Sequence, residues 1–232
     1  MVQLYEMTEI DLPDRLDLWQ IALDFPALSY YNGGHINGAC KSRSFKEVSP
    51  MKHTQIKQMV LAALYAALIC VMTLAVQIPI PSTDGYINMG DCFCLLAAWT
   101  MPPLWGIAAA GIGSMLADLI AYPVYVPATL IIKAGLAALA VLIYRAMLRN
   151  RTESNRWRLA ACVVSGIVAE LFMVAGYFFF NALIRGKGWA AAPSIPGNLI
   201  QGAFGIIAAT AVLQLLLRNP KLRARIDGKD PS

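Results

Sequence analysis

Long apolar segments constrain the fold of this chain more than any other feature. Between residues 59 and 217 the apolar residues form blocks of about 20, separated by short polar or proline-containing breaks. A helix of that length crosses the roughly 30 Å hydrocarbon core of a bilayer. Segment 159–180 is apolar on all sides, whereas the helices of soluble proteins carry a polar face. With 58% hydrophobic and 14% charged residues, the chain is predicted to be an all-α integral membrane protein.

Prolines and polar runs divide the apolar region into a predicted bundle of six transmembrane helices. Proline cannot continue a helix and disfavours helical geometry in the residue before it. The predicted helices cover about 56–77, 87–101, 104–121, 128–148, 158–181 and 198–217. The second has only about 11 residues from Asp91 onward, roughly 17 Å of helix. It must therefore tilt, begin earlier near Tyr86, or be sheltered by its neighbours. Segment 183–197 is predicted to be a loop.

Basic residues indicate the orientation of this bundle, because cytoplasmic loops carry an excess of lysine and arginine. With six helices, both termini share one side with the linker 149–158. The basic residues on that side are Lys52, Lys57, Arg145, Arg149, Arg151, Arg156, Arg158, Arg218, Lys221, Arg223 and Arg225. The other side holds only Arg185 and Lys187. The sequence therefore predicts cytoplasmic N- and C-termini and a multi-pass protein of the cytoplasmic membrane.

The first 50 residues differ from the rest of the chain. They are mixed and somewhat acidic, and they lack the basic and apolar regions of a signal peptide. Met51 begins a polar run that directly precedes the first predicted membrane helix. One hypothesis is that Met51 is the true start of translation. The alternative is a genuine cytosolic arm of residues 1–50, and the intact mass of the native protein distinguishes the two.

Polar residues gather at one predicted depth, near the outer ends of the helices. They are Asp91, Asp118, Tyr122, Tyr125, Lys133, Tyr177, Asn181, Asn198 and Gln201, with Glu170 deeper. An ionisable group in hydrocarbon costs several kcal/mol, so a shared depth indicates an outward-facing pocket for a small molecule.

Each of these residues also has a structural interpretation. Asp91 and Asn198 are plausible helix caps. For Asp118 and Lys133 the alternative is a structural ion pair with each other. Tyr122 and Tyr125 suit the interfacial aromatic belt, and the alternative for Glu170 is a polar partner on a neighbouring helix.

Small residues four apart mark a second surface. The first helix carries two overlapping Ala-x-x-x-Ala pairs made by Ala62, Ala63, Ala66 and Ala67, and the third carries Gly106, Ala110 and Ser114. Such spacing lets membrane helices approach closely. It serves packing within the bundle or docking of a partner.

Several kinds of site are not predicted. The sequence has no phosphate-binding loop and no H-E-x-x-H helix. Its two histidines precede the membrane blocks, and Cys92-Phe-Cys94 lacks zinc-ligand spacing. We therefore expect no metal, no cofactor and no catalysis by the chain. A membrane-embedded enzyme using Asp91 and Asp118 lacks a recognisable catalytic set.

The motifs GYINMGD at 85–91 and GIGSMLADLIAYPVYVPATLIIKAG at 111–135 resemble the substrate-binding S components of energy-coupling factor (ECF) vitamin transporters, closest to the riboflavin type. The resemblance covers about 56–217. It implies a six-helix subunit that captures a vitamin or vitamin precursor outside the cell. It further implies a transmembrane scaffold subunit and two cytosolic ATPases as partners, with the four alanines of the first helix at the scaffold.

By the same resemblance, the ligand pocket is built from the first extracellular loop and helices four to six. The implied ligand residues are Asn88, Lys133, Tyr177, Asn181, Asn198 and Gln201, with Asp118 structural, and Tyr125 is a further candidate because it lies at the same predicted depth. A riboflavin, pyridoxine-like or pyrimidine-like compound would suit one cation among amides and aromatic rings. The alternative function is a ligand-free membrane scaffold of the cell-envelope or cell-shape type.

Overall fold

The structure is a computed structural model that describes residues 53–79, 86–149 and 154–226. These described residues all belong to one compact unit. The hypotheses about the extension 1–50 and a start at Met51 concern residues outside the described part, and they stay predictions.

Five of the described helices are long and apolar enough to cross a membrane. They are α2 (His53–Ala75), α4 (Pro103–Ala121), α5 (Val126–Leu148), α6 (Asn155–Phe179) and α7 (Ser194–Leu216). Two shorter helices accompany them, α3 (Gly90–Thr100) and α8 (Pro220–Ile226). The described part is thus a mostly helical, multi-pass membrane protein.

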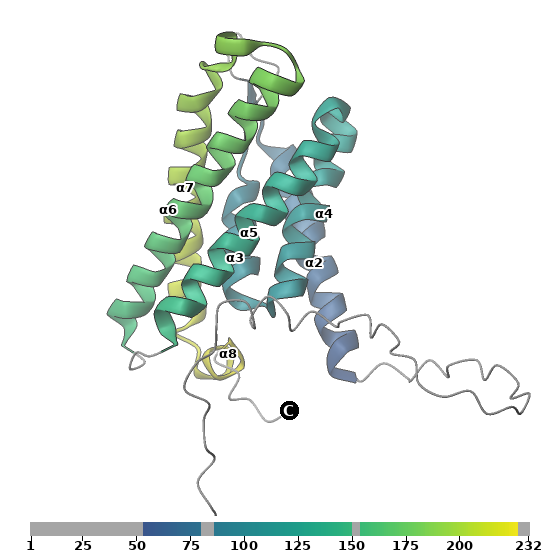
Figure 1. Cartoon of the computed structure of the whole chain (residues 1–232). Helices are drawn as coiled ribbons and strands as arrows, with labels where there is room; N and C mark the ends of the chain where they lie inside the picture. The colour runs from purple at the N-terminus through teal and green to yellow at the C-terminus, as the bar shows by residue number, and fades with distance from the viewer. Residues whose placement is uncertain (1–52, 80–85, 150–153, 227–232) are drawn as a thin grey trace, which may run out of the picture. The chain divides into compact units, whose positions relative to one another are not determined.

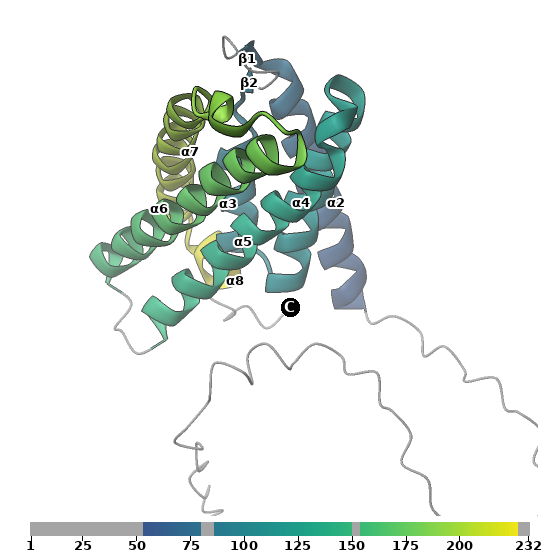
Figure 2. The same ribbon diagram turned by 45° about the horizontal axis from the view of Figure 1, so that its top comes forward.

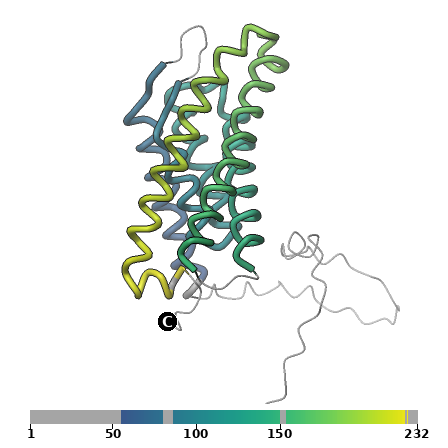
Figure 3. The backbone as a smooth tube through the Cα atoms, turned by 90° about the vertical axis from the view of Figure 1, so that its left-hand side faces the viewer, coloured from purple at the N-terminus to yellow at the C-terminus, as the bar shows by residue number. Residues whose placement is uncertain are grey.

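The long helices pack in sequence order around a short central one (Figure 1). α2 packs on α4, α4 on α5, α5 on α6 and α6 on α7, and α3 contacts α2, α4, α5 and α7. The tube view shows the same side-by-side arrangement (Figure 3). Nine of the eleven residues of α3 are buried. Its neighbours therefore shelter this helix, which explains why a segment too short to span the bilayer can be so apolar.

Small residues set the spacing of these helices. A Cβ added at Gly113 of α4 would lie 2.5 Å from the backbone oxygen of Ala66 in α2. A Cβ added at Gly106 would lie 2.7 Å from the backbone oxygen of Ala97 in α3. Real Cβ atoms do not approach this closely, so these positions admit only glycine without a shift of the helices.

The connections at the outer end contain more structure than the sequence indicated. Strands β1 (Ile78–Pro79) and β2 (Tyr86–Ile87) pair antiparallel in the first loop, seen at the top of Figure 2. The predicted loop 183–197 is partly helical, because α7 begins at Ser194. A π-helical turn, η2 (Phe180–Ile184), extends α6, and a 3₁₀ turn, η3 (Gly188–Ala191), precedes α7. Local helical turns satisfy backbone groups that an open loop would leave bare near the apolar layer.

Candidate functional site

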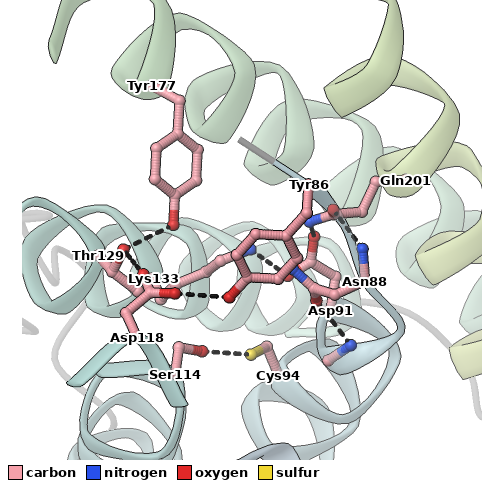
Figure 4. Close-up of polar contacts among 11 residues, drawn as sticks. Tyr86, Asn88, Asp91, Cys94, Ser114, Asp118, Thr129, Lys133, Tyr177 and Gln201 are labelled. Carbon is pink, nitrogen blue, oxygen red and sulfur yellow. Dashed lines mark hydrogen bonds and ion pairs between the residues drawn. The ribbon is translucent and has the colours of Figure 1, made fainter. Parts of the chain in front are cut away.

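One polar cavity lies between α2, α4, α5, α6, α7 and the first loop, at the helix ends that are predicted to face outward. It has a volume of about 40 Å³. All seven residues proposed to contact a ligand line it: Asn88, Tyr125, Lys133, Tyr177, Asn181, Asn198 and Gln201. Figure 4 shows most of its polar contacts. The folded chain therefore brings together side chains from position 88 to position 201.

A buried ion pair forms the floor of this network. The Lys133 ammonium of α5 donates to Asp91 of α3, and these residues are only 2% and 1% exposed. The Gln201 amide of α7 donates to the second Asp91 oxygen at 2.6 Å. Its own carbonyl oxygen accepts from the Asn88 backbone N–H at 2.8 Å. This chain of contacts joins the first loop to three helices, and it gives the buried charges the hydrogen bonds that they need.

Asp118 of α4 is the centre of a second set of contacts. Its carboxylate accepts from the Tyr86 hydroxyl at 2.5 Å and from the Thr129 hydroxyl. Because the Thr129 proton is used in this way, the Tyr177 hydroxyl must donate to the Thr129 oxygen, 3.0 Å away. Two hydroxyls, those of Tyr86 and Thr129, thus stabilise a carboxylate that would otherwise be costly to bury, and Tyr177 supports Thr129.

A third set of contacts reaches the outer rim of the cavity. The Tyr125 hydroxyl donates to the Asn181 side-chain oxygen at 2.8 Å, and it accepts from the Arg185 guanidinium at 2.9 Å. That guanidinium also lies over the Tyr125 ring, 5.2 Å from its centroid. Asn181 belongs to the π-helical turn, and such turns often occur at functional sites.

Tyr86 ties the first loop to the bundle. Its ring stacks on Tyr122 with centroids 4.7 Å apart, while its hydroxyl reaches Asp118. Burial, together with the negative charge of Asp118, raises the pKa of the Tyr86 phenol above its usual value. The phenol therefore stays protonated and remains a hydrogen-bond donor throughout the physiological pH range.

The structure corrects three of the structural interpretations. Asp91 does not cap α3, because its carboxylate binds Lys133 and Gln201 and the helix already begins at Gly90. Asn198 does not cap α7, because it lies inside a helix that begins at Ser194. The Lys133 ammonium pairs with Asp91 and not with Asp118, whose carboxylate is occupied by hydroxyl donors. In each case a longer helix or a tertiary contact replaces the expected local one.

Glu170 lies deeper and does not line the cavity. It is 4% exposed, and neither carboxyl oxygen has a hydrogen-bond partner among the described residues. The carboxyl group packs against Gly202 and Gly205 of α7, where an added Cβ would lie 3.1 and 3.4 Å from its oxygens. The expected polar partner on a neighbouring helix is therefore not present in the described part.

Sequence reasoning missed five residues that line the cavity. They are Thr73, Tyr86, Ser114, Thr129 and Ser194. Helical spacing was a usable signal, because Ser114 precedes Asp118 by four residues and Thr129 precedes Lys133 by four. Tyr86 precedes Asn88 by two, which is the same-face spacing of an extended chain.

The four alanines of α2 face two directions. Ala62 is 7% exposed and belongs to a buried cluster with Ala97 and Ala109. Ala66 contacts Gly113 of α4. Ala63 and Ala67 are exposed on the outer surface. Packing inside the bundle therefore uses one Ala-x-x-x-Ala pair, and the other pair remains accessible.

Within the described segments, no three histidine, cysteine, aspartate or glutamate side chains are grouped so as to hold a metal ion. The polar groups of the cavity are amides, hydroxyls, one ammonium and the single carboxylate of Asp118, which already accepts from two hydroxyls. They suit hydrogen bonding to an organic ligand better than metal coordination.

Comparison with known proteins decides the family. Residues 53–218 match the family described as ECF-type riboflavin transporter, S component. The chain belongs to this family. A solved structure of the S component of a bacterial ECF transporter is similar in fold, with a TM-score of 0.56 and 22% identity, over 71% of this chain and 97% of that one. The resemblance inferred from the sequence motifs is thus confirmed, and the family is one of transporter subunits.

A relative in Pyrococcus woesei, described as an "uncharacterized protein in gap 3'region", is 37% identical over 140 residues. The match covers 60% of this S component and 87% of the relative.

Proposed function

We propose that this S component captures a vitamin or vitamin precursor with a small polar ring and delivers it to an ATP-driven ECF importer. The observation that carries the proposal is the buried cavity itself. Thirteen residues from the first loop and five helices line it, almost all of them polar or aromatic. Such groups are expensive inside a membrane protein, so their convergence favours a binding function.

The chemistry of the lining supports a ring with hydrogen-bonding edges. Asn181, Asn198 and Gln201 offer amides that both donate and accept. Tyr125 and Tyr177 offer aromatic faces, and the Lys133 ammonium lies 5.7 Å from the Tyr177 ring centroid. Riboflavin, a pyridoxine-like compound and a pyrimidine-like compound all present matching groups.

The present cavity is too small for such a ligand. A site for a small organic molecule occupies roughly 300 Å³ or more, against about 40 Å³ here. Tyr86 and Asn88 join the first loop to Asp118 and Gln201 across the cavity. Ligand entry therefore requires these contacts to break, and the first loop acts as the movable cover.

Transport requires partners. As in ECF importers generally, we expect a transmembrane scaffold subunit and two ATPase subunits to supply the energy, and we expect the complex to lie in the cytoplasmic membrane. A ligand-free membrane scaffold is the competing function. It has no use for a buried polar cavity and is less well supported.

Mass spectrometry of small molecules that copurify with the chain tests this proposal. We expect a ring-containing vitamin or precursor, and we expect binding of the same compound by calorimetry. Riboflavin, pyridoxine and hydroxymethylpyrimidine form the first panel. If nothing copurifies and no compound of the panel binds, the ligand-free scaffold function is favoured.

A further inference from the structure

A second cavity lies at the opposite end of the bundle. It is formed by the start of α6, the end of α7 and α8, and its volume is about 420 Å³. Figures 1 and 2 show α8 beside these helix ends, away from the β pair. From Arg158 to Asn181, α6 and its π-helical extension cover about 35 Å. The second cavity is therefore separate from the proposed vitamin site.

Positive charge surrounds this cavity. Arg158 of α6, Arg218 of the turn after α7 and Arg223 of α8 line it, and none of the lining residues that the structure describes is acidic. Arg158 is only 7% exposed. A cavity lined by several guanidinium groups attracts anions electrostatically. The planar guanidinium group binds phosphate oxygens through paired hydrogen bonds.

An independent observation points to a ligand that accepts hydrogen bonds. The side-chain amide nitrogen of Gln214, which also lines the cavity, is buried and has no hydrogen-bond partner among the described residues. A buried donor without an acceptor costs roughly 1–3 kcal/mol. The Asn155 side chain adds a further polar group to the same wall.

The surroundings of the cavity favour a lipid as the source of the phosphate. Leu159 and Leu217 form its apolar wall. Both belong to the ends of membrane helices, at the level where headgroups meet acyl chains. Basic pockets between helix ends on the cytoplasmic side bind anionic headgroups in other membrane proteins. The arginine-rich end of this bundle is the predicted cytoplasmic side.

We propose that this cavity binds the phosphate-bearing headgroup of an anionic phospholipid. Arg218 and Arg223 hold the phosphate from the rim, and Gln214 donates from the buried wall. The site is independent of the vitamin cavity, so its failure leaves the transport proposal unaffected.

The test compares two double variants of the full chain that each remove two positive charges. Arg218→Gln with Arg223→Gln alters the cavity. Arg156→Gln with Lys221→Gln alters exposed residues of α6 and α8 that do not line it. Native mass spectrometry measures the apparent dissociation constant for short-chain phosphatidylglycerol, with phosphatidylcholine as reference. Each arginine near an anionic lipid is worth about fivefold in affinity, so we expect a loss of roughly 25-fold for the cavity variant and less than about threefold for the control.

Three results would overturn the proposal. Equal losses in both double variants would indicate diffuse electrostatic attraction. Inorganic phosphate that binds as tightly as phosphatidylglycerol would identify a phosphate site without lipid. The third result has two parts: the cavity variant binds lipid as tightly as the parent chain, but it no longer captures the scaffold subunit. This result would assign the cavity to an acidic protein segment. The single variant Arg218→Gln, with an expected fivefold loss, replaces the double variant if the latter does not fold.

Discussion

The ion pair between Asp91 and Lys133 joins two helices whose sequence separation gives no hint of contact. Both side chains are buried and hydrogen-bonded in the structure. Removing one partner of such a pair leaves an uncompensated charge, whereas removing both leaves none. Single and double substitutions of this pair therefore test whether α3 and α5 pack as the structure describes.

We predict that Lys133→Met destabilises the protein by about 3–5 kcal/mol, because Asp91 is then left buried without its counter-ion. Adding Asp91→Asn should restore most of the loss. Thermal unfolding in detergent measures the stability of Lys133→Met, of Asp91→Asn and of the double variant. If the double variant is as unstable as the sum of the singles, the two residues are not paired in the folded protein.

A second prediction concerns Gly90 at the start of α3. An added Cβ would lie 2.1 Å from the Thr73 hydroxyl oxygen and 3.1 Å from the Asn88 side-chain oxygen. Gly90→Ala should therefore cost about 1–3 kcal/mol through overpacking. Thr73→Ala should suppress this cost by removing the clashing oxygen. Thermal unfolding compares Gly90→Ala alone with Gly90→Ala combined with Thr73→Ala. If the combined variant is as unstable as Gly90→Ala alone, the clash lies elsewhere.

At the scale of elements, α2 presents two different faces. Ala62 and Ala66 pack inside the bundle, and Ala63 and Ala67 lie on the outside. Large apolar residues such as Leu64, Leu68 and Val71 are exposed on the same helix. The outer pair is thus the part of the motif that a scaffold subunit can reach.

We predict that Ala63→Leu and Ala67→Leu reduce vitamin uptake at least severalfold, because bulky residues prevent close helix approach. Ligand binding by the purified subunit should be unchanged. Ala203→Leu, on an exposed face of α7, is the matched control and should affect neither. A parallel loss of binding and uptake would argue against docking through this surface.

At the scale of the whole bundle, the two ends differ in chemistry. One end holds the small polar cavity under the first loop, and the other holds the arginine-lined cavity and the basic linker. The positive-inside rule predicts that the basic end faces the cytoplasm. We therefore expect the polar cavity to face outward, as uptake requires.

This orientation gives a prediction of its own. A cysteine placed at Trp189, which is 87% exposed, should react with a membrane-impermeant maleimide in intact cells. A cysteine placed at Ser154, also exposed, should react only after the membrane is opened. The parent chain supplies the background labelling, since it has cysteines of its own. The reverse labelling pattern would show that the bundle has the opposite orientation, so that the polar cavity does not face outward.

The sequence by itself determined the membrane class, the approximate segments and the common depth of the candidate ligand residues. Hydrophobic length and the cost of buried charge are properties of the local chain, so they can be evaluated before folding. The motif around Asn88 and the segment containing Lys133 also carried the family resemblance.

Only the tertiary structure decided which residues touch. Each step along a helix turns the side-chain direction by about 100°. One position therefore separates Ala62, which is buried, from Ala63, which is exposed. The same uncertainty of rotation made Asp118 the expected ion-pair partner of Lys133, whereas the structure pairs Lys133 with Asp91. The rotation and crossing of each helix are set by packing against segments far away in the sequence. The sequence of one segment alone therefore does not determine them.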